Sequence, residues 1–572
     1  MTKKSLAAVL AATLVGIAAC SDGGSGGASP SAGPASGARA ERCDPGLDKA
    51  FGAWERAGFS GTVAIARRGR FACLAGYGRA EEAAGRPHTA DTVFSIGSVT
   101  KAVTAATVYR LVDDGELALD DRVGDLLPEL SGPVAEVTVR QLLLHTSGLD
   151  GTHGQDHRPL SRAAALTAIG RMGLAFEPGS HYAYSNAGYT LLALIIDEVS
   201  GRGYRPYTEA TLLRLPGGER VGGFWDGRPK AVGPRAVGYL EGGRTGARGD
   251  FDGPHWALEG NGGLAMSARD LALWTQAVFG GRLVSARSTA ALRTVGHDHG
   301  GGRGETPGWV AYDASRFGKP VLASAGGGGD VGHDVVVLWV PEDQQVVVIA
   351  SNRPEVPAEE LARKVGPALL ADEPLPTPRL LTNRAPGAQV AAGRYALPTG
   401  GTFRVSPATS TDGGLQVTAR GIDAVGRLFP PSDRAQAKEF EAMERRVRAL
   451  LAGTTSEGRA ERASVEKSYG RLRKVELAGT IHRDGDVRTY LTLTTAERSV
   501  TGWYAVDEAG GVIAAEVPTR QPALTLLPAG GGRYRPQDPT DAGPRVTVRF
   551  TKATMTLTGP AGDTVTATTT AQ

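Results

Sequence analysis

The sequence predicts an α/β (α+β) domain in which helices flank an antiparallel sheet, followed by a β-rich C-terminal region with an inserted helix. Strand-like apolar runs stand at both ends of residues 41–372, and segments with helical periodicity lie between them. One sheet built from both ends is the economical arrangement. Beyond residue 386, short alternating stretches dominate. With 572 residues the chain exceeds one ordinary domain, so two or three are expected.

The first forty residues predict export and a lipid anchor. Lys3 and Lys4 precede an apolar stretch, Leu6–Ala19, that is too short to span a bilayer and is typical of a signal peptide. The small residues before Cys20 resemble the lipobox of bacterial lipoproteins, which implies a diacylated Cys20 as the first mature residue. A plain cleaved signal peptide is the alternative. Residues 21–40 predict a flexible tether. With the signal peptide and the lipid on Cys20, the expected location is extracytoplasmic, at the bacterial cell membrane.

The elements expected in the first domain follow its apolar spacing. The helix that begins at Ser98 is apolar on most faces, which places it in a core, and Asp113-Asp114-Gly115 ends it. Helices are expected at 46–58, 98–112, 139–145, 162–172, 186–200 and 268–279, and strands at 62–66, 71–77, 320–323, 334–339 and 345–350.

The Pro-rich segment 373–386 predicts a linker to the C-terminal region, 387–572. In that region an amphipathic helix and several short strands are expected, at 435–451 for the helix and at 402–405, 415–419, 490–494 and 545–558 for the strands. Two arrangements fit: a small barrel split by an α+β insertion near 431–530, or one continuous α+β domain.

The net charge bears on which partners the chain could bind, and the cysteine content bears on whether it forms a disulfide. Lys and Arg total 63 against 60 for Asp and Glu, so no net field favours nucleic acid. If Cys20 carries lipid, Cys43 and Cys73 remain as a pair in an oxidising compartment. A disulfide between them and two buried free thiols both remain open. The sequence carries no signal of oligomeric state.

Ser98 and Lys101 form the most informative motif, Ser-x-x-Lys. One helical turn separates them, so both side chains project from the same face. Serine is a poor nucleophile until a neighbour takes its proton, and a lysine takes it only in the neutral form that desolvation favours. Free N–H groups at the helix start would also stabilise an acyl oxyanion. For this motif alone, a capping serine with a surface lysine is the common alternative.

Further segments carry a family resemblance: residues 138–149 with His-Thr-Ser-Gly-Leu, 176–189 with Tyr-Ser-Asn, and 260–271 with Asn-Gly-Gly-Leu. With residues 93–119 around Ser98, they resemble the class C β-lactamase superfamily of serine hydrolases. That superfamily includes penicillin-binding proteins, D-alanyl-D-alanine carboxypeptidases, D-aminopeptidases and carboxylesterases. The resemblance runs from residue 44 to 368 and implies a β-lactamase/transpeptidase-like catalytic domain.

By this resemblance Tyr184 and Asn186 form the Tyr-x-Asn motif. The phenol of Tyr184 would share the proton of Ser98 and Lys101 and pass it to the leaving group. Asn186 offers both a donor and an acceptor to a substrate amide or ester. No cofactor is implied.

The third family motif departs from its usual pattern, because Ser324 stands where a Lys or His is expected. Gly326, Gly327 and Gly328 can still let substrate approach closely, and one N–H of this strand can complete an oxyanion hole with that of Ser98. The missing base removes a partner for a substrate carboxylate. β-Lactamase and carboxypeptidase activities are therefore less expected than broad esterase or amidase activity.

Several histidines offer alternative interpretations. The resemblance places His145 in a structural loop, and a satisfied or solvated side chain is expected for His333 rather than one that faces the cleft. His297-Asp298-His299 resembles a metal-ligand pair, but neighbouring glycines and the lack of a third ligand favour a loop. No metal is expected.

The sequence therefore predicts an exported serine hydrolase that cleaves an ester or amide through an acyl-enzyme on Ser98. Its substrate would be a small molecule or a peptide of cell-wall origin, with D-alanyl or other D-amino-acid amides and small esters ahead of β-lactams. The alternative is a catalytically weak surface protein that binds peptide or glycan. The C-terminal region shows no second site and is expected to form a wall or lid.

Overall fold

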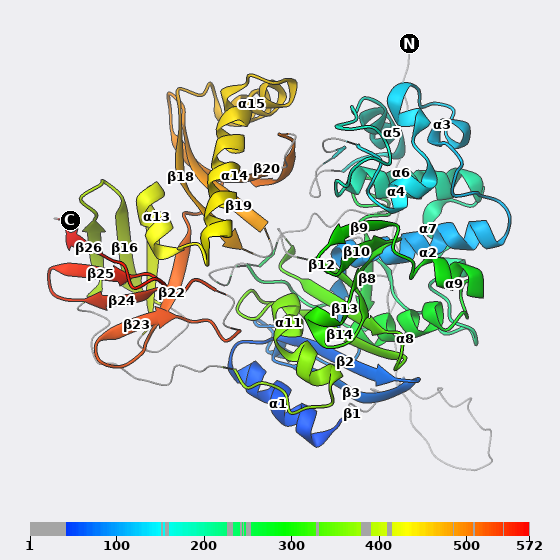
Figure 1. Cartoon of the computed structure of the whole chain (residues 1–572), viewed down its shortest axis with the longest axis horizontal. Helices are drawn as coiled ribbons and strands as arrows, with labels where there is room; N and C mark the ends of the chain where they lie inside the picture. Colours follow the sequence, from blue (N-terminus) through cyan, green and yellow to red (C-terminus); the bar gives the residue numbers. More distant parts are fainter. Residues whose placement is uncertain are drawn as a thin grey trace, which may run out of the picture. The chain divides into compact units, whose positions relative to one another are not determined.

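The computed structural model describes most of the chain after residue 41 (Figure 1). Within 42–572, the residues outside the description are 150–152, 155–158, 226–232, 241–242, 244, 247–252, 328–330, 379–390, 409–413, 484–485, 507–509, 541–542 and 571–572. The expected signal peptide, Cys20 and tether, most of the expected linker, and Gly328 thus lie outside the described residues.

A nine-stranded antiparallel sheet forms the centre of the first domain, in the order β1-β3-β2-β14-β13-β12-β11-β10-β9. The strands are β1 (Arg42–Cys43), β2 (Gly61–Arg67), β3 (Arg70–Tyr77), β9 (His297–Gly300), β10 (Arg303–Thr306), β11 (Trp309–Tyr312), β12 (Val321–Gly327), β13 (Asp334–Val340) and β14 (Gln345–Ser351). β2 pairs with β14, with Ala64 opposite Val348, so the two ends of the domain meet in one sheet. The predicted fold class is confirmed.

Helices cover both faces of this sheet, because its central strands are apolar on both sides. Val63 and Ile349 point to one face and pack with α1 (Pro45–Arg56) and α11 (Ala358–Leu370). Ala64 and Val348 point to the other, against α2 (Thr100–Asp113), α6 (Asn186–Val199) and α8 (Ala268–Phe279). The remaining helices are α3 (Val123–Leu126), α4 (Val139–Leu143), α5 (Arg162–Gly170), α7 (Tyr204–Thr211), α9 (Ala286–Ala291) and α10 (Ala314–Phe317), with the 3-10 turns η1 (Gly97–Val99) and η2 (Gly132–Glu136).

A small three-stranded sheet brings the start of α2 close to a turn that is far away in the sequence. It consists of β6 (Val93–Ser95), β8 (Leu264–Ser267) and β7 (Gly223–Phe224), with Phe94 opposite Met266. β6 leads directly into η1, and β8 follows the turn at residues 255–263. This pairing brings that turn beside the first residues of α2.

The C-terminal region contains a closed eight-stranded barrel and a separate four-stranded sheet. The barrel consists of β15 (Gly393–Ala396), β16 (Thr402–Pro407), β17 (Leu415–Arg420), β22 (Ala523–Pro528), β23 (Arg533–Pro536), β24 (Thr547–Phe550), β25 (Thr554–Thr558) and β26 (Thr564–Thr569). Between β17 and β22 the chain forms α13 (Ile422–Leu428), α14 (Arg434–Ala452), α15 (Ser456–Tyr469), β18 (Lys474–Arg483), β19 (Asp486–Thr494), β20 (Ser499–Val506) and β21 (Val512–Glu516). Figure 1 shows α14 lying along the β18–β21 sheet. Val447 of this helix and Leu491 of the sheet belong to one apolar core.

Two sequence expectations are corrected by these elements. His297–Gly300 is strand β9 rather than a loop, because it pairs with β10 at the edge of the large sheet. The expected strand 545–558 is two strands, β24 and β25, joined by a turn in which Thr551 accepts and donates hydrogen bonds. Within the described residues, no helix is both long and apolar enough to cross a membrane.

The structure joins Cys43 and Cys73 by a disulfide. The two residues lie opposite each other in the pairing of β1 with β3. The bond ties the start of the domain to the edge of its sheet.

Candidate active site

Ser98 and Lys101 lie where β6 runs into α2, as the Ser-x-x-Lys spacing predicts. Ser98 is in the 3-10 turn η1 and Lys101 is in the first turn of α2, so the helix proper begins two residues after the serine. Lys101 Nζ is 3.1 Å from Ser98 Oγ. The lysine is only 3% exposed, which is rare for this residue and requires polar partners.

Tyr184 and Asn186 reach the same point from the start of α6. Ser185 caps this helix by accepting a hydrogen bond from the Gly188 N–H, which fixes the residues on either side of it. Tyr184 Oη is 2.8 Å from Ser98 Oγ, and Asn186 Oδ1 accepts a hydrogen bond of 2.8 Å from Lys101 Nζ. The ring of Tyr184 lies 4.7 Å from Lys101 Nζ and is 49% exposed, so the phenol stands on the open side of the pair.

Three oxygen atoms surround the amine of Lys101 and fix its direction. Besides Ser98, Nζ contacts Asn186 Oδ1 and, at 3.1 Å, the backbone carbonyl of Asn261. Both are acceptors only. In the structure Nζ donates to all three oxygens, and a neutral amine that kept the Asn186 and Asn261 acceptors would turn its lone pair toward Ser98 Oγ. The geometry therefore suits removal of the serine proton by Lys101.

Strand β12 packs directly against the backbone of Ser98 through its glycines. A Cβ on Gly326 would come within 2.3 Å of Ser98 N, and a Cβ on Gly97 within 2.8 Å of Gly327 N. Side chains alternate along a strand, so Ser324 lies on the same face as Gly326, and it is buried. Only glycine lets the two backbones approach this closely.

These contacts bring together the residues of three family motifs from η1 and α2, from α6, and from β12. The profile of the Beta-lactamase family matches residues 48–372, which is more than half of the chain. The chain belongs to the beta-lactamase family.

Proteins similar to this chain include a penicillin-binding protein, an esterase and a D-alanine hydrolase. The chain is 33% identical over 240 residues to the putative penicillin-binding protein PbpX of Bacillus subtilis, covering 42% of this chain and 60% of that protein. It is 34% identical over 223 residues to esterase EstB of Burkholderia gladioli, covering 36% of this chain and 55% of the esterase. Teichoic acid D-alanine hydrolase of Staphylococcus aureus is 31% identical over 149 residues, 26% of this chain and 36% of that enzyme.

The fold also resembles a solved structure across most of the chain. The octameric penicillin-binding protein homologue from Pyrococcus abyssi superposes with a TM-score of 0.51, at 20% identity, over 81% of this chain and 96% of its own. At this identity the likeness describes the fold alone.

In this member of the beta-lactamase family His145 holds Tyr184 in place rather than contacting Ser98. Its Nδ1 accepts a hydrogen bond of 3.0 Å from the N–H of Ser185, and its ring stacks on that of Tyr184 at 4.5 Å. Burial lowers the pKa of His145 well below its usual value, and the Lys101 charge lowers it further, so the ring is neutral. His145 adopts a positive φ of 56°, which the turn after α4 imposes.

Two other histidines, His333 and His299, have polar partners within the fold. His333 is buried, and its Nδ1 accepts a hydrogen bond of 3.1 Å from the N–H of Ser95. His299 Nε2 lies 3.1 Å from the Glu305 carboxylate on β10, and its ring meets the edge of Tyr182. In the part of the chain that the structure describes, no three His, Cys, Asp or Glu side chains form a metal-binding group.

Sequence reasoning missed one direct partner of Lys101, the carbonyl of Asn261. Any residue type can supply a backbone carbonyl, so no residue type signals it. The Asn-Gly-Gly-Leu segment marks the position, but only the pairing of β6 with β8 brings it to Lys101.

Proposed function

We propose that this protein is an exported serine hydrolase that cleaves an ester or amide through an acyl-enzyme on Ser98. The observation that carries the proposal is that Ser98 Oγ lies within hydrogen-bond distance of both Lys101 Nζ, at 3.1 Å, and Tyr184 Oη, at 2.8 Å. A serine with a buried amine on one side and a phenol on the other can lose a proton and attack in one step.

In acylation, Lys101 takes the proton of Ser98 as Oγ attacks the substrate carbonyl. The oxyanion that develops is stabilised by the backbone N–H groups of Ser98 and of Gly327, where glycine keeps the approach open. Tyr184, on the exposed side of the serine, donates its proton to the leaving alkoxide or amine and regains one from Lys101.

In deacylation, water attacks the acyl-enzyme along the path that the leaving group has vacated. Tyr184 and Lys101 accept a proton from this water, and the proton returns to Ser98 Oγ when the acyl bond breaks. The enzyme ends the cycle in its starting state, so the overall reaction is hydrolysis.

Esters and D-amino-acid amides or esters are the substrates that the site favours. The relatives include an esterase and a teichoic acid D-alanine hydrolase, which supports this class. Ser324 on β12 offers a neutral hydroxyl where a cation would bind a free substrate carboxylate. Substrates without that carboxylate are therefore preferred over β-lactams and D-alanyl-D-alanine peptides.

We also propose that the protein is held at the outer face of the cell membrane through a lipid on Cys20. The lipobox-like residues before Cys20 and the tether 21–40 support this location. The disulfide between Cys43 and Cys73 supports an oxidising compartment. Replacing Cys20 by Ser should move the protein from the membrane fraction to the medium or periplasm, and unchanged membrane retention would refute the anchor.

The proposed chemistry is tested by covalent labelling. Purified protein lacking residues 1–40 is incubated with a fluorophosphonate probe and, separately, with a fluorescent penicillin, beside Ser98→Ala. Gel fluorescence and intact mass report the adduct. We expect fluorophosphonate labelling of the wild type, none of Ser98→Ala, and little penicillin labelling.

Absence of fluorophosphonate labelling in folded protein would refute the hydrolase and favour the binding protein without turnover. Strong penicillin labelling would instead keep the acyl-enzyme and overturn the preference against β-lactams.

A further inference from the structure

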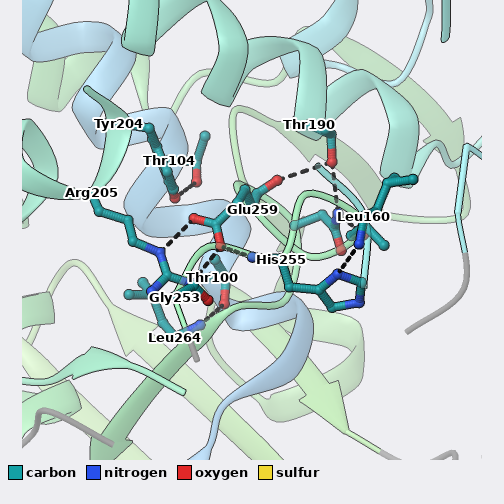
Figure 2. A network of polar contacts seen from close by, with 12 residues as sticks. Thr100, Thr104, Leu160, Thr190, Tyr204, Arg205, Gly253, His255, Glu259 and Leu264 are labelled. Atoms are coloured by element: carbon teal, nitrogen blue, oxygen red, sulfur yellow. Dashed lines mark hydrogen bonds and ion pairs between the residues drawn. The ribbon is translucent and has the colours of Figure 1, made fainter. Parts of the chain in front are cut away.

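A polar network that includes Thr190, Arg205 and Glu259 surrounds the turn next to Lys101 (Figure 2). Its centre is the turn at residues 255–263, which carries the Asn261 carbonyl that accepts from Lys101 Nζ. The turn belongs to neither a helix nor a strand, so it is held by backbone hydrogen bonds of its own, such as those from the Asn261 and Gly262 N–H groups to the Leu258 carbonyl, and by side chains of neighbouring helices.

Thr190 is the junction of the network. Its hydroxyl donates a hydrogen bond of 2.9 Å to the carbonyl of Glu259 and accepts one of 2.9 Å from Asn261 Nδ2. Asn261 Nδ2 also donates to the Ala257 carbonyl at 2.9 Å. Thr190 and Asn261 are both buried, so their hydrogen bonds are shielded from water.

Helix α6 therefore controls both acceptors that hold the amine of Lys101. Asn186 contributes Oδ1 directly, and Thr190, one turn further along the same helix face, holds the side chain of Asn261 and the carbonyl of Glu259, on the turn that carries the Asn261 carbonyl. A shift of either acceptor would turn the lone pair of Lys101 away from Ser98 Oγ.

A buried ion pair fixes the same turn from the opposite side. Arg205 on α7 contacts both carboxylate oxygens of Glu259, with Nη2 at 2.6 Å from Oε1 and Nε at 3.0 Å from Oε2, and the His255 N–H donates to Oε1. Figure 2 shows Glu259 with its carboxylate toward Arg205 and its backbone toward Thr190. A buried ion pair adds little net stability, so its geometric constraint is the more informative property.

We propose that Thr190, supported by the Arg205–Glu259 pair, is a positioning residue that aims the amine of Lys101 at Ser98 through the Asn261 carbonyl. The inference rests on the proposed Ser98 chemistry. It adds a residue that touches neither substrate nor the reacting atoms.

The test compares the kinetics of fluorophosphonate labelling in Thr190→Val and wild type. Valine has nearly the same shape as threonine but forms no side-chain hydrogen bonds. The substitution therefore removes the hydrogen bonds to Glu259 and Asn261 while the packing is kept. We expect the maximal labelling rate at saturating probe to fall about tenfold, with the probe concentration for half-maximal rate unchanged. Thr190→Ser, which keeps the hydroxyl, should label at the wild-type rate.

The matched control is Thr107→Val on α2. Thr107 is also fully buried, but its hydroxyl donates only to the Val103 carbonyl one turn earlier. Thr107→Val should label like the wild type. If both valine variants slow labelling equally, or if Thr190→Val labels at the wild-type rate, the positioning role is refuted.

Arg205→Lys gives a second route if Thr190→Val does not fold. Lysine keeps the charge but cannot hold both oxygens of Glu259, so the maximal labelling rate should again fall with unchanged half-saturation. A wild-type rate in folded Arg205→Lys would refute the proposal. Failure of the wild type itself to label would refute the hydrolase instead, so the two failures are distinguishable.

Discussion

Glu305 carries a buried carboxyl group near Lys101, and the proposed mechanism does not use it. Burial raises its pKa to about 7, which outweighs the opposite effects of Arg303, of a hydrogen bond from Tyr182 and of Lys101. Burial also lowers the pKa of its partner His299, with Arg303 and His297 adding to the effect. Glu305 is therefore about half protonated near pH 7 and keeps its proton below that pH.

This shift predicts a pH-dependent stability. The native protein keeps a proton on Glu305 between pH 4.5 and about 7 that the unfolded chain releases, so its contribution to stability is lost as the pH rises through that window. Glu305→Gln should match the wild type at pH 4.5 and be the more stable at pH 8, by at most on the order of 3 kcal/mol. Urea unfolding at both pH values measures the difference.

The comparison at pH 4.5, where Glu305 keeps its proton in the native protein, provides the control. A Glu305→Gln offset that does not change with pH would contradict the assigned shift.

Among the elements, β12 imposes the tightest steric condition on the site. Gly326→Ala would place a methyl group 2.3 Å from Ser98 N and 2.5 Å from the Ile96 carbonyl, so η1 must move. Because oxyanion stabilisation depends on the position of that N–H, labelling of Ser98 should fall by about 100-fold, with a stability loss of about 1 to 3 kcal/mol. Labelling rates and thermal unfolding measure the two effects.

Gly52→Ala in α1 is the matched control. A Cβ there meets nothing closer than 3.8 Å, and alanine favours helix over glycine by about 1 kcal/mol. It should leave labelling unchanged and raise stability slightly. Equal labelling of Gly326→Ala and wild type would show that η1 tolerates the methyl group.

The elements also show how far the sequence can be interpreted alone. Strongly periodic segments such as α6 and the strands β13 and β14 are predicted within a few residues, because periodicity records the buried face directly. The strand β9 at His297 is missed, because its polar and glycine-rich sequence is ordered only by pairing with β10. Helices α11 and α15 are also absent from the prediction.

Some residues of the site can likewise be predicted from the sequence, and others cannot. Ser98, Lys101, Tyr184 and Asn186 are found from motif spacing, and the structure brings their side chains together. The Asn261 carbonyl and its support by Thr190 and Glu259 are not found, since they depend on backbone direction and on pairing between segments far apart in the chain.

At the scale of the whole molecule, the first domain and the C-terminal region have different apolar cores. The large sheet has a core on each face. The barrel core around Phe403 and Leu526 also includes Ile481 and Tyr490 of the inserted module, which has a further core around Val447 and Leu491. Separate cores of this kind allow the first domain and the C-terminal region to unfold as different cooperative units.

We therefore predict more than one transition in scanning calorimetry. A phosphonate on Ser98 should move only the transition of residues 41–372, because Lys101 and Tyr184, the described side-chain partners of Ser98, belong to that domain. The experiment compares unlabelled with fully labelled protein, using Ser98→Ala treated with probe as the control. A single transition that moves as a whole would show that the regions unfold together.

The distances along the chain between the parts of the site have a consequence for biosynthesis. Ser98 is made early, the Asn261 carbonyl and Thr190 follow, and Gly327 emerges only when most of the domain has left the ribosome. A chain that stops between Ser98 and Gly327 therefore carries the nucleophile without the strand that lies against it. Such a chain lacks the backbone N–H groups of β12 beside Ser98, so we expect reactivity toward a fluorophosphonate to arise only after that strand has been made.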